Sequence, residues 1–336
     1  MSRATLLLVI GTSAIASCFP PGASGPGFRM APESIRGPHW SDLESQLHGT
    51  LTVVDEFHGT RVYVAHLPEG RITETYLPSV DALDACSIPG GNDAYALLDD
   101  GRIVHAAQGL EFKPIFKTKD AVEPGSSIAL SPDGSTIALL HQLASDDWSH
   151  PNPYRLTLVD VTTGRTLDLP GEFNGYRPCW APDGKSIYAT ESHGRIVQCS
   201  LVPSDADHCV GEGRAPLLSE NEMWLMFAPN SRPAREWTGV AWRISSTLMR
   251  WTIGTTEGPE TLPVQVHGVG QVIAVSATGL IVVESEPDER LPLEHSGFFM
   301  RGPYWRGGIS VFDPSTGATE PLFVGIAPNS IQWRWD

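Results

Sequence analysis

The hydrophobic and polar positions of the chain repeat one short pattern, in which an apolar run, a turn and a second apolar run follow each other. Two copies are clear, residues 127–138 and residues 178–189, and each centres on Pro-Asp-Gly. Proline presets the φ angle of a turn, aspartate bonds back to its own backbone, and glycine accepts positive φ. Each copy therefore predicts a β-hairpin. The copies lie about 50 residues apart, which is typical of repeat architectures.

Extending this pattern along the chain gives a unit of four strands joined by turns and loops. The apolar runs are rich in Val, Ile, Leu, Tyr and Trp, which strands favour. Five complete units are predicted, at residues 85–116, 127–169, 176–211, 216–264 and 271–324. The fourth of these is the least regular.

Two incomplete pieces remain outside these units. Residues 51–77 hold the second, third and fourth strands of a unit, and residues 330–335 hold a first strand. Joined together they make a sixth unit and close the series into a ring, which removes the free sheet edges of a linear array. We therefore predict an all-β fold, a six-bladed β-propeller whose C-terminal strand pairs with the N-terminal blade. Seven blades, a linear set of sheets and a sandwich are the alternatives.

The sequence Ser-Pro-Asp-Gly at 131–134 and the sequence Trp-Ala-Pro-Asp-Gly-Lys at 180–185 carry a resemblance to known proteins. They resemble the Pro-Asp-Gly, WD-repeat-like pattern of TolB-like periplasmic propellers and of the propeller of prolyl oligopeptidases. The pattern is degenerate at 220–222 and 277–279, where other residues replace the turn. The resemblance implies the propeller fold and protein partners. It says little about activity, because propellers host binding platforms and enzymes alike.

The N-terminus predicts export and a lipid anchor. An apolar run from Leu6 to Ala16 follows Met-Ser-Arg and is too short to span a membrane. Ile-Ala-Ser-Cys at 15–18 resembles the bacterial lipobox, so we expect a signal peptide at 1–17 and lipidation of Cys18. An ordinary cleaved signal is the alternative. Phe19 follows the cysteine, and the absence of aspartate there implies the outer membrane, facing the periplasm, by the sorting rule of bacterial lipoproteins.

The remaining chain is expected to divide into a tether and one domain. Residues 18–48 are rich in Pro and Gly and predict a tether with a short helix beginning at Ser41, and residues 49–336 form the propeller. The formal charge of −16 argues against nucleic acid as a partner, because phosphate binding needs a basic surface. The eleven histidines show no metal-ligand spacing, so we expect neither a metal nor another cofactor.

Four cysteines lie within the predicted propeller. Cys199 and Cys209 fall on the two strands of one hairpin, and an exported protein meets oxidising conditions, so we predict a disulfide between them. Cys86 and Cys179 fall on first strands two blades apart. That separation is too large for a bond, so we expect two buried free thiols.

The sequence contains only weak signals of a catalytic site. No Gly-x-Ser-x-Gly elbow is present. Acidic residues and histidines gather at 55–58 and at 141–150, but carboxylates and histidines in loops are usually solvated. We therefore expect a protein without enzymatic activity, with an enzyme as the rival interpretation.

Three long insertions interrupt the repeat between the second and third strands of a unit, at residues 142–154, 228–247 and 285–308. They should share one face of a propeller, and long loops are uncommon without a role. Aromatic residues and arginine, which dominate binding hot spots, are frequent in them. The predicted partner-binding residues are Trp148, Tyr154, Arg235, Trp237, Trp242, Phe298, Phe299, Arg301, Tyr304 and Trp305. The alternative is that these aromatic residues pack on each other and only hold the loops.

These observations favour a lipid-anchored propeller of the bacterial envelope that acts as a protein-binding or scaffold module. We expect a monomer with envelope proteins as partners and the lipid anchor as its membrane contact. Two other classes stay open. One is a lyase, hydrolase or cyclotransferase with its site at the mouth of the central channel, and the other is a carbohydrate-binding module.

Overall fold

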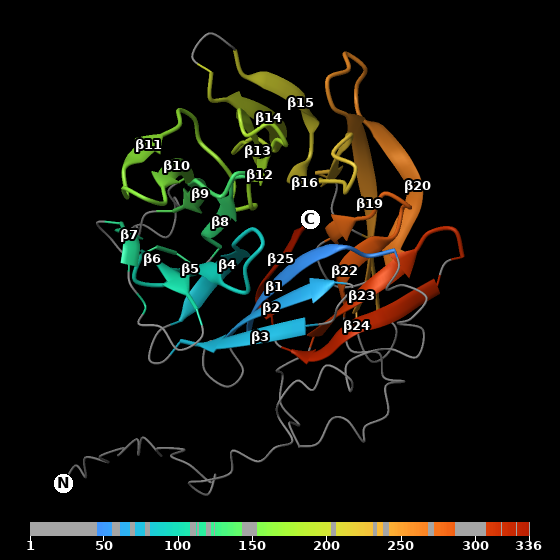
Figure 1. The fold of residues 1–336 in the computed structure, drawn as a ribbon. Helices are drawn as coiled ribbons and strands as arrows, with labels where there is room; N and C mark the ends of the chain where they lie inside the picture. The colour runs from blue at the N-terminus through green and yellow to red at the C-terminus, as the bar shows by residue number, and fades with distance from the viewer. Residues whose placement is uncertain are drawn as a thin grey trace, which may run out of the picture. The chain divides into compact units, whose positions relative to one another are not determined.

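The computed structural model describes residues 46–335 with some exceptions. The exceptions are residues 56–60, 68–70, 78–80, 108–111, 113, 119–121, 124, 143–152, 203–205, 231–233, 238–241, 268–271, 286–306, 317 and 327. Every element among the described residues is a β-strand, and the strands form six antiparallel sheets arranged as a propeller (Figure 1). No described segment forms a helix that could cross a membrane.

The first blade combines strands from the two ends of the described chain. It consists of β1 (Gly49–Asp55), β2 (Arg61–Leu67), β3 (Arg71–Tyr76) and β25 (Pro328–Arg334), in the order β25-β1-β2-β3. Leu51 lies opposite Trp333 and Val53 lies opposite Ile331. Strand β25 is therefore the inner strand of the blade, as predicted, and Figure 1 shows it in red beside the blue β1.

The next three blades each follow the chain from the inner strand outwards. Blade two consists of β4 (Ala82–Ser87), β5 (Ala94–Leu98), β6 (Arg102–Ala106) and β7 (Pro114–Lys117). Blade three consists of β8 (Ser127–Leu130), β9 (Thr136–His141), β10 (Arg155–Asp160) and β11 (Thr166–Asp168). Blade four consists of β12 (Cys179–Trp180), β13 (Ser186–Thr190), β14 (Arg195–Ser200) and β15 (His208–Glu212).

Blade five carries an extra strand. It consists of β16 (Arg214–Leu218), β17 (Trp224–Ala228), β18 (Ala234–Trp237), β19 (Trp242–Thr252) and β20 (Glu260–His267). Strands β17 and β18 both pair with the long β19, so the insertion extends the sheet as a hairpin. Blade six consists of β21 (Val272–Val275), β22 (Ile281–Ser285), β23 (Gly307–Asp313) and β24 (Ala318–Ile326). The count of six blades confirms the prediction, and the irregularity of the fourth predicted unit reflects this added hairpin.

The core lies between neighbouring blades. Leu140 of blade three packs in one cluster with Ile187 of blade four, and Tyr188 of blade four packs with Phe227 of blade five. Each of these four side chains is fully buried. Because both faces of a blade are covered by its neighbours, the sheets must twist and stack around an axis, and the inner strands line a central channel. The short helix predicted from Ser41 lies largely outside the described residues, and Gly49 begins β1.

Candidate functional site

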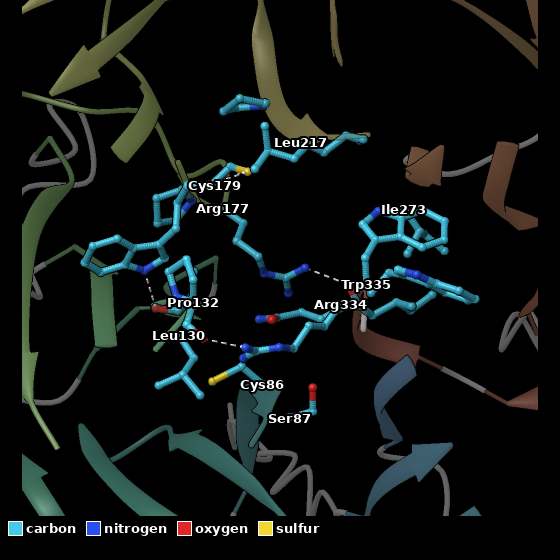
Figure 2. Close-up of a pocket in the computed structure, with 18 of the residues that line it drawn as sticks. Cys86, Ser87, Leu130, Pro132, Arg177, Cys179, Leu217, Ile273, Arg334 and Trp335 are labelled. Atoms are coloured by element: carbon cyan, nitrogen blue, oxygen red, sulfur yellow. Dashed lines mark hydrogen bonds between the residues drawn. The ribbon is translucent and has the colours of Figure 1, made fainter. Parts of the chain in front are cut away.

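A cavity of about 330 Å³ occupies the central channel (Figure 2). All six inner strands, or the residues beside them, contribute to its wall. One representative from each blade, from blade two to blade six and then blade one, is Cys86, Leu130, Cys179, Leu217, Ile273 and Arg334. The volume is within the range of small-molecule sites.

A buried carboxylate lies beside this cavity and joins several blades. The side chain of Asp84 on β4 is only 1% exposed. Arg177, just before β12, forms an ion pair with it at 2.5 Å between Nη2 and Oδ1, and Arg177 Nε donates to Oδ2 at 3.2 Å. The backbone N–H of Ile128 on β8 also donates to Oδ2, at 2.8 Å. These donors replace the water that burial takes away from the carboxylate.

The closing strand β25 joins the same network. Arg177 Nη1 donates to the carbonyl oxygen of Ile331 at 2.6 Å, and the Ser330 hydroxyl donates to Asp84. Gln332 Nε2 donates to the carbonyl oxygen of Ile128 at 2.6 Å. Blades one, two, three and four therefore share one hydrogen-bonded cluster. We call Asp84, Arg177, Ser330 and Gln332 the closure cluster.

Two thiols stand in the cavity wall. Burial is the main cause that raises the pKa of Cys86, with the negative charge of Asp84 adding to it, and burial raises the pKa of Cys179 to about 12. Both cysteines are free and both lie on inner strands, as predicted, but Cys86 is buried whereas Cys179 is half-buried. A thiol that stays protonated at neutral pH is a poor nucleophile, so these cysteines favour packing over covalent chemistry.

One end of the cavity reaches the turns that join an inner strand to the second strand of its blade. We call these the inner turns and define them as residues 131–135, 181–185, 219–223 and 276–280. Pro132, Pro182 and Glu222 of three inner turns line the cavity. Arg334 crosses to the first of them and donates from Nη2 to the carbonyl oxygen of Pro132 at 2.8 Å. In Figure 2, Arg177 and Arg334 extend into the cavity from two different blades.

An aromatic pair borders the same opening. Trp333 and Trp335, at the end of β25, have ring centroids 5.1 Å apart, and both line the cavity. The described wall thus combines indole rings, two guanidinium groups and the Glu222 carboxylate. Such a wall can hold a ligand through stacking and charge.

The cavity is poorly equipped for acid–base catalysis within the described residues. Its deep carboxylate is engaged by the closure cluster, and its thiols have raised pKa values. In the described part of the chain, no group of three or more His, Cys, Asp or Glu side chains could hold a metal ion.

The predicted disulfide between Cys199 and Cys209 is not formed in the structure. Both cysteines are free, with Cys199 buried and Cys209 exposed. The register explains the difference, because Val197 pairs with Cys209 and Gln198 pairs with His208, so Cys199 does not lie opposite Cys209.

Of the predicted partner-binding residues, Tyr154 is fully described. It is half-buried, exchanges backbone hydrogen bonds with Phe173, and packs against the cluster between blades three and four. Burial raises the pKa of its hydroxyl. Tyr154 therefore contributes to packing.

The remaining members of that set are described in part or not at all. Strand β18 carries Arg235 and Trp237, and Trp242 begins β19 opposite Trp237, so these three lie on the added hairpin of blade five. Six others lie outside the described residues: Trp148, Phe298, Phe299, Arg301, Tyr304 and Trp305. Cys18 also lies outside them.

The closure cluster was not foreseen from the sequence. Asp84, Arg177 and Gln332 belong to different blades, and nothing in their local sequence predicts that they meet. The one local signal is a charged residue at position 84, immediately before the first complete unit predicted at 85–116.

Comparison with known proteins supports the fold. No family model and no curated protein matches the sequence. Among solved structures, TolB from Acinetobacter baumannii is similar with a TM-score of 0.56 and 13% identity, over 86% of this chain and 67% of that one. A putative TolB from Agrobacterium tumefaciens has a TM-score of 0.50 and 14% identity, over 85% of this chain and 98% of that one.

An enzyme shares the same architecture. Oligogalacturonate lyase from Vibrio parahaemolyticus has a TM-score of 0.52 and 11% identity, over 82% of this chain and 75% of that one. At such identities the likeness establishes the propeller fold alone, because one fold hosts unrelated functions.

Proposed function

We propose that this chain is a binding protein of the bacterial cell envelope that holds a segment of a partner protein at the central cavity. The proposal rests on the observation that the cavity wall holds two groups of residues, one that joins the blades and one that lines the opening. The closure cluster uses the buried carboxylate and Arg177 to join blades. Arg334, Trp335 and Glu222 line the opening with charge and aromatic surface, which is the chemistry of recognition.

The envelope location rests on the N-terminal sequence. Lipidation of Cys18 would tether the propeller to the outer membrane, facing the periplasm, and the likeness to two TolB structures supports an envelope role. Labelled palmitate should enter the wild-type chain and should not enter Cys18→Ser. We expect the protein to act as a monomer.

The three insertions form a second part of the proposal. In the sequence, each insertion follows the second strand of its blade. Their aromatic and arginine residues, including Trp148 and Trp305, would extend the contact with an envelope partner.

Site-specific photo-crosslinking in the producing cell tests the proposal. A benzophenone amino acid replaces Met223, which is 56% exposed on an inner turn, or Trp148 in an insertion. Leu167, which is 61% exposed on the outer strand β11, is the matched control. We expect one discrete protein adduct from Met223, absent from Leu167. An adduct from Trp148 alone would move the site to the insertions and overturn the cavity as the site.

Two rival outcomes would replace the proposal. The likeness to oligogalacturonate lyase makes an enzyme the specific competitor. Release of unsaturated products from oligogalacturonate, without any protein adduct, would establish an enzyme. Saturable binding of a glycan without turnover or adduct would establish a carbohydrate-binding module.

A further inference from the structure

Four inner turns share one backbone geometry. In each, the fourth residue donates its N–H to the carbonyl oxygen of the first, at 2.9–3.0 Å. That fourth residue has positive φ every time, and in three turns it is glycine: Gly134 at 75°, Gly184 at 65° and Gly279 at 90°. In blade five it is Glu222, at 56°. A side chain in this left-handed region is strained, which is why glycine stands there in the other turns.

Two other residues of the blade-five turn, Asn221 and Glu220, form hydrogen bonds that hold the turn in place. Asn221 Oδ1 accepts the N–H of Met223 at 3.2 Å, as Asp133 and Asp183 accept the equivalent N–H groups in their turns. Glu220 accepts the N–H of Ala277 at 2.6 Å and so joins blade five to blade six. The turn would keep all of these bonds with glycine in place of Glu222.

The side chain of Glu222 does not hold the turn in this way. Its side chain forms no hydrogen bond or ion pair with the residues that the structure describes, and it is exposed where it lines the cavity. A strained residue whose side chain stabilises nothing in its own chain points to a role in function.

We propose that Glu222 is a specificity residue that binds a cationic group, the ammonium or guanidinium of a lysine or arginine in the bound partner segment. A carboxylate forms charge-assisted hydrogen bonds with such groups, and the indole of Trp335, which lines the same cavity, attracts a cation through its ring face. This inference rests on the proposed function, because it assigns the chemistry that the cavity selects.

The test compares three variants of the full-length chain. Glu222→Gly removes both strain and charge, and Glu222→Gln keeps the strain and removes the charge. Ala215→Gly is the matched control, because Ala215 is the other described non-glycine residue with positive φ and does not line the cavity. Melting curves should rise by about 2 °C for both glycine variants and stay unchanged for Glu222→Gln.

Binding is measured by ligand-observed NMR with two peptide probes, acetyl-Gly-Lys-Gly-amide and the same peptide with acetyl-lysine. Wild type and Ala215→Gly should prefer the charged peptide by about tenfold. Both Glu222 variants should lose this preference. A preference that survives in Glu222→Gln, or one that is absent in wild type, would overturn the inference. If the Met223 adduct persists in that case, the proposed function stands and only the role of Glu222 is wrong.

Discussion

The ion pair between Asp84 and Arg177 makes a quantitative prediction about ring closure. Replacing Arg177 by methionine removes both guanidinium bonds to Asp84, the bond to the carbonyl oxygen of Ile331 and the one to the Ser330 hydroxyl. Asp84 is 1% exposed and cannot recover water as a partner. Breaking a buried pair in this way costs about 3–5 kcal/mol. Because Ile128 and Gln332 still donate to Asp84, we expect about 3 kcal/mol.

The reverse substitution should cost less. Asp84→Asn leaves a guanidinium whose side chain is 23% exposed and can reach solvent, so we expect about 1–2 kcal/mol. The double variant Asp84→Asn with Arg177→Met should be more stable than the sum of the single losses implies, with a coupling energy of at least about 1 kcal/mol.

The assay is urea unfolding followed by tryptophan fluorescence. Arg195→Met is the matched control, because Arg195 and Glu191 also approach to 2.5 Å but have side chains that are 50% and 27% exposed. A surface pair of that kind contributes about 0–1 kcal/mol. Equal losses for Arg177→Met and Arg195→Met would refute the reasoning that the closure cluster stabilises the ring.

Three further predictions concern other positions. Gly49→Ala should lower the free energy of unfolding by about 1–3 kcal/mol, because Gly49 has φ of 132° and a Cβ there would lie 2.3 Å from the carbonyl oxygen of Arg334; an unchanged urea midpoint would contradict this. At about pH 8, Cys179, with its pKa raised to about 12, should react with a disulfide reagent far more slowly than the exposed Cys209, and equal rates would show that the channel thiol is accessible and ionised. Burial lowers the pKa of His141 below its usual 6.5, so the unfolded chain binds the proton first as pH falls. Stability should therefore drop as the pH falls through about 6.5, and urea titrations of His141→Gln should show a smaller drop.

Much of the fold was predictable because its signals are local. The alternation of apolar runs and turn residues predicts the exact bounds of strands such as 94–98 and 186–190, and the structure confirms them. Ring closure was predictable too. Residues 51–77 supply the second, third and fourth strands of a blade, and residues 330–335 supply the missing first strand. The pairing of Leu51 with Trp333 confirms that inference.

The site was less predictable because its contacts are not local. Asp84 meets Ser330 only after the ring has closed, and no spacing in the sequence encodes that meeting. The disulfide prediction was wrong because it placed both cysteines on one hairpin without its register, which pairs Cys209 with Val197. Glu222 did leave a signal, because it replaces the glycine when the turn is aligned with its neighbours.

The pairing of β1 with β25 also affects how the protein is made. Ribosomes synthesise about 5–20 residues per second, so β1 waits on the order of tens of seconds before its partner strand exists. During that interval β1 has an unpaired edge, which is a template for aggregation. The nascent chain should therefore depend on chaperones until residues 328–334 emerge. An interrupted product would keep that open edge, so incomplete molecules become recognisable to proteases.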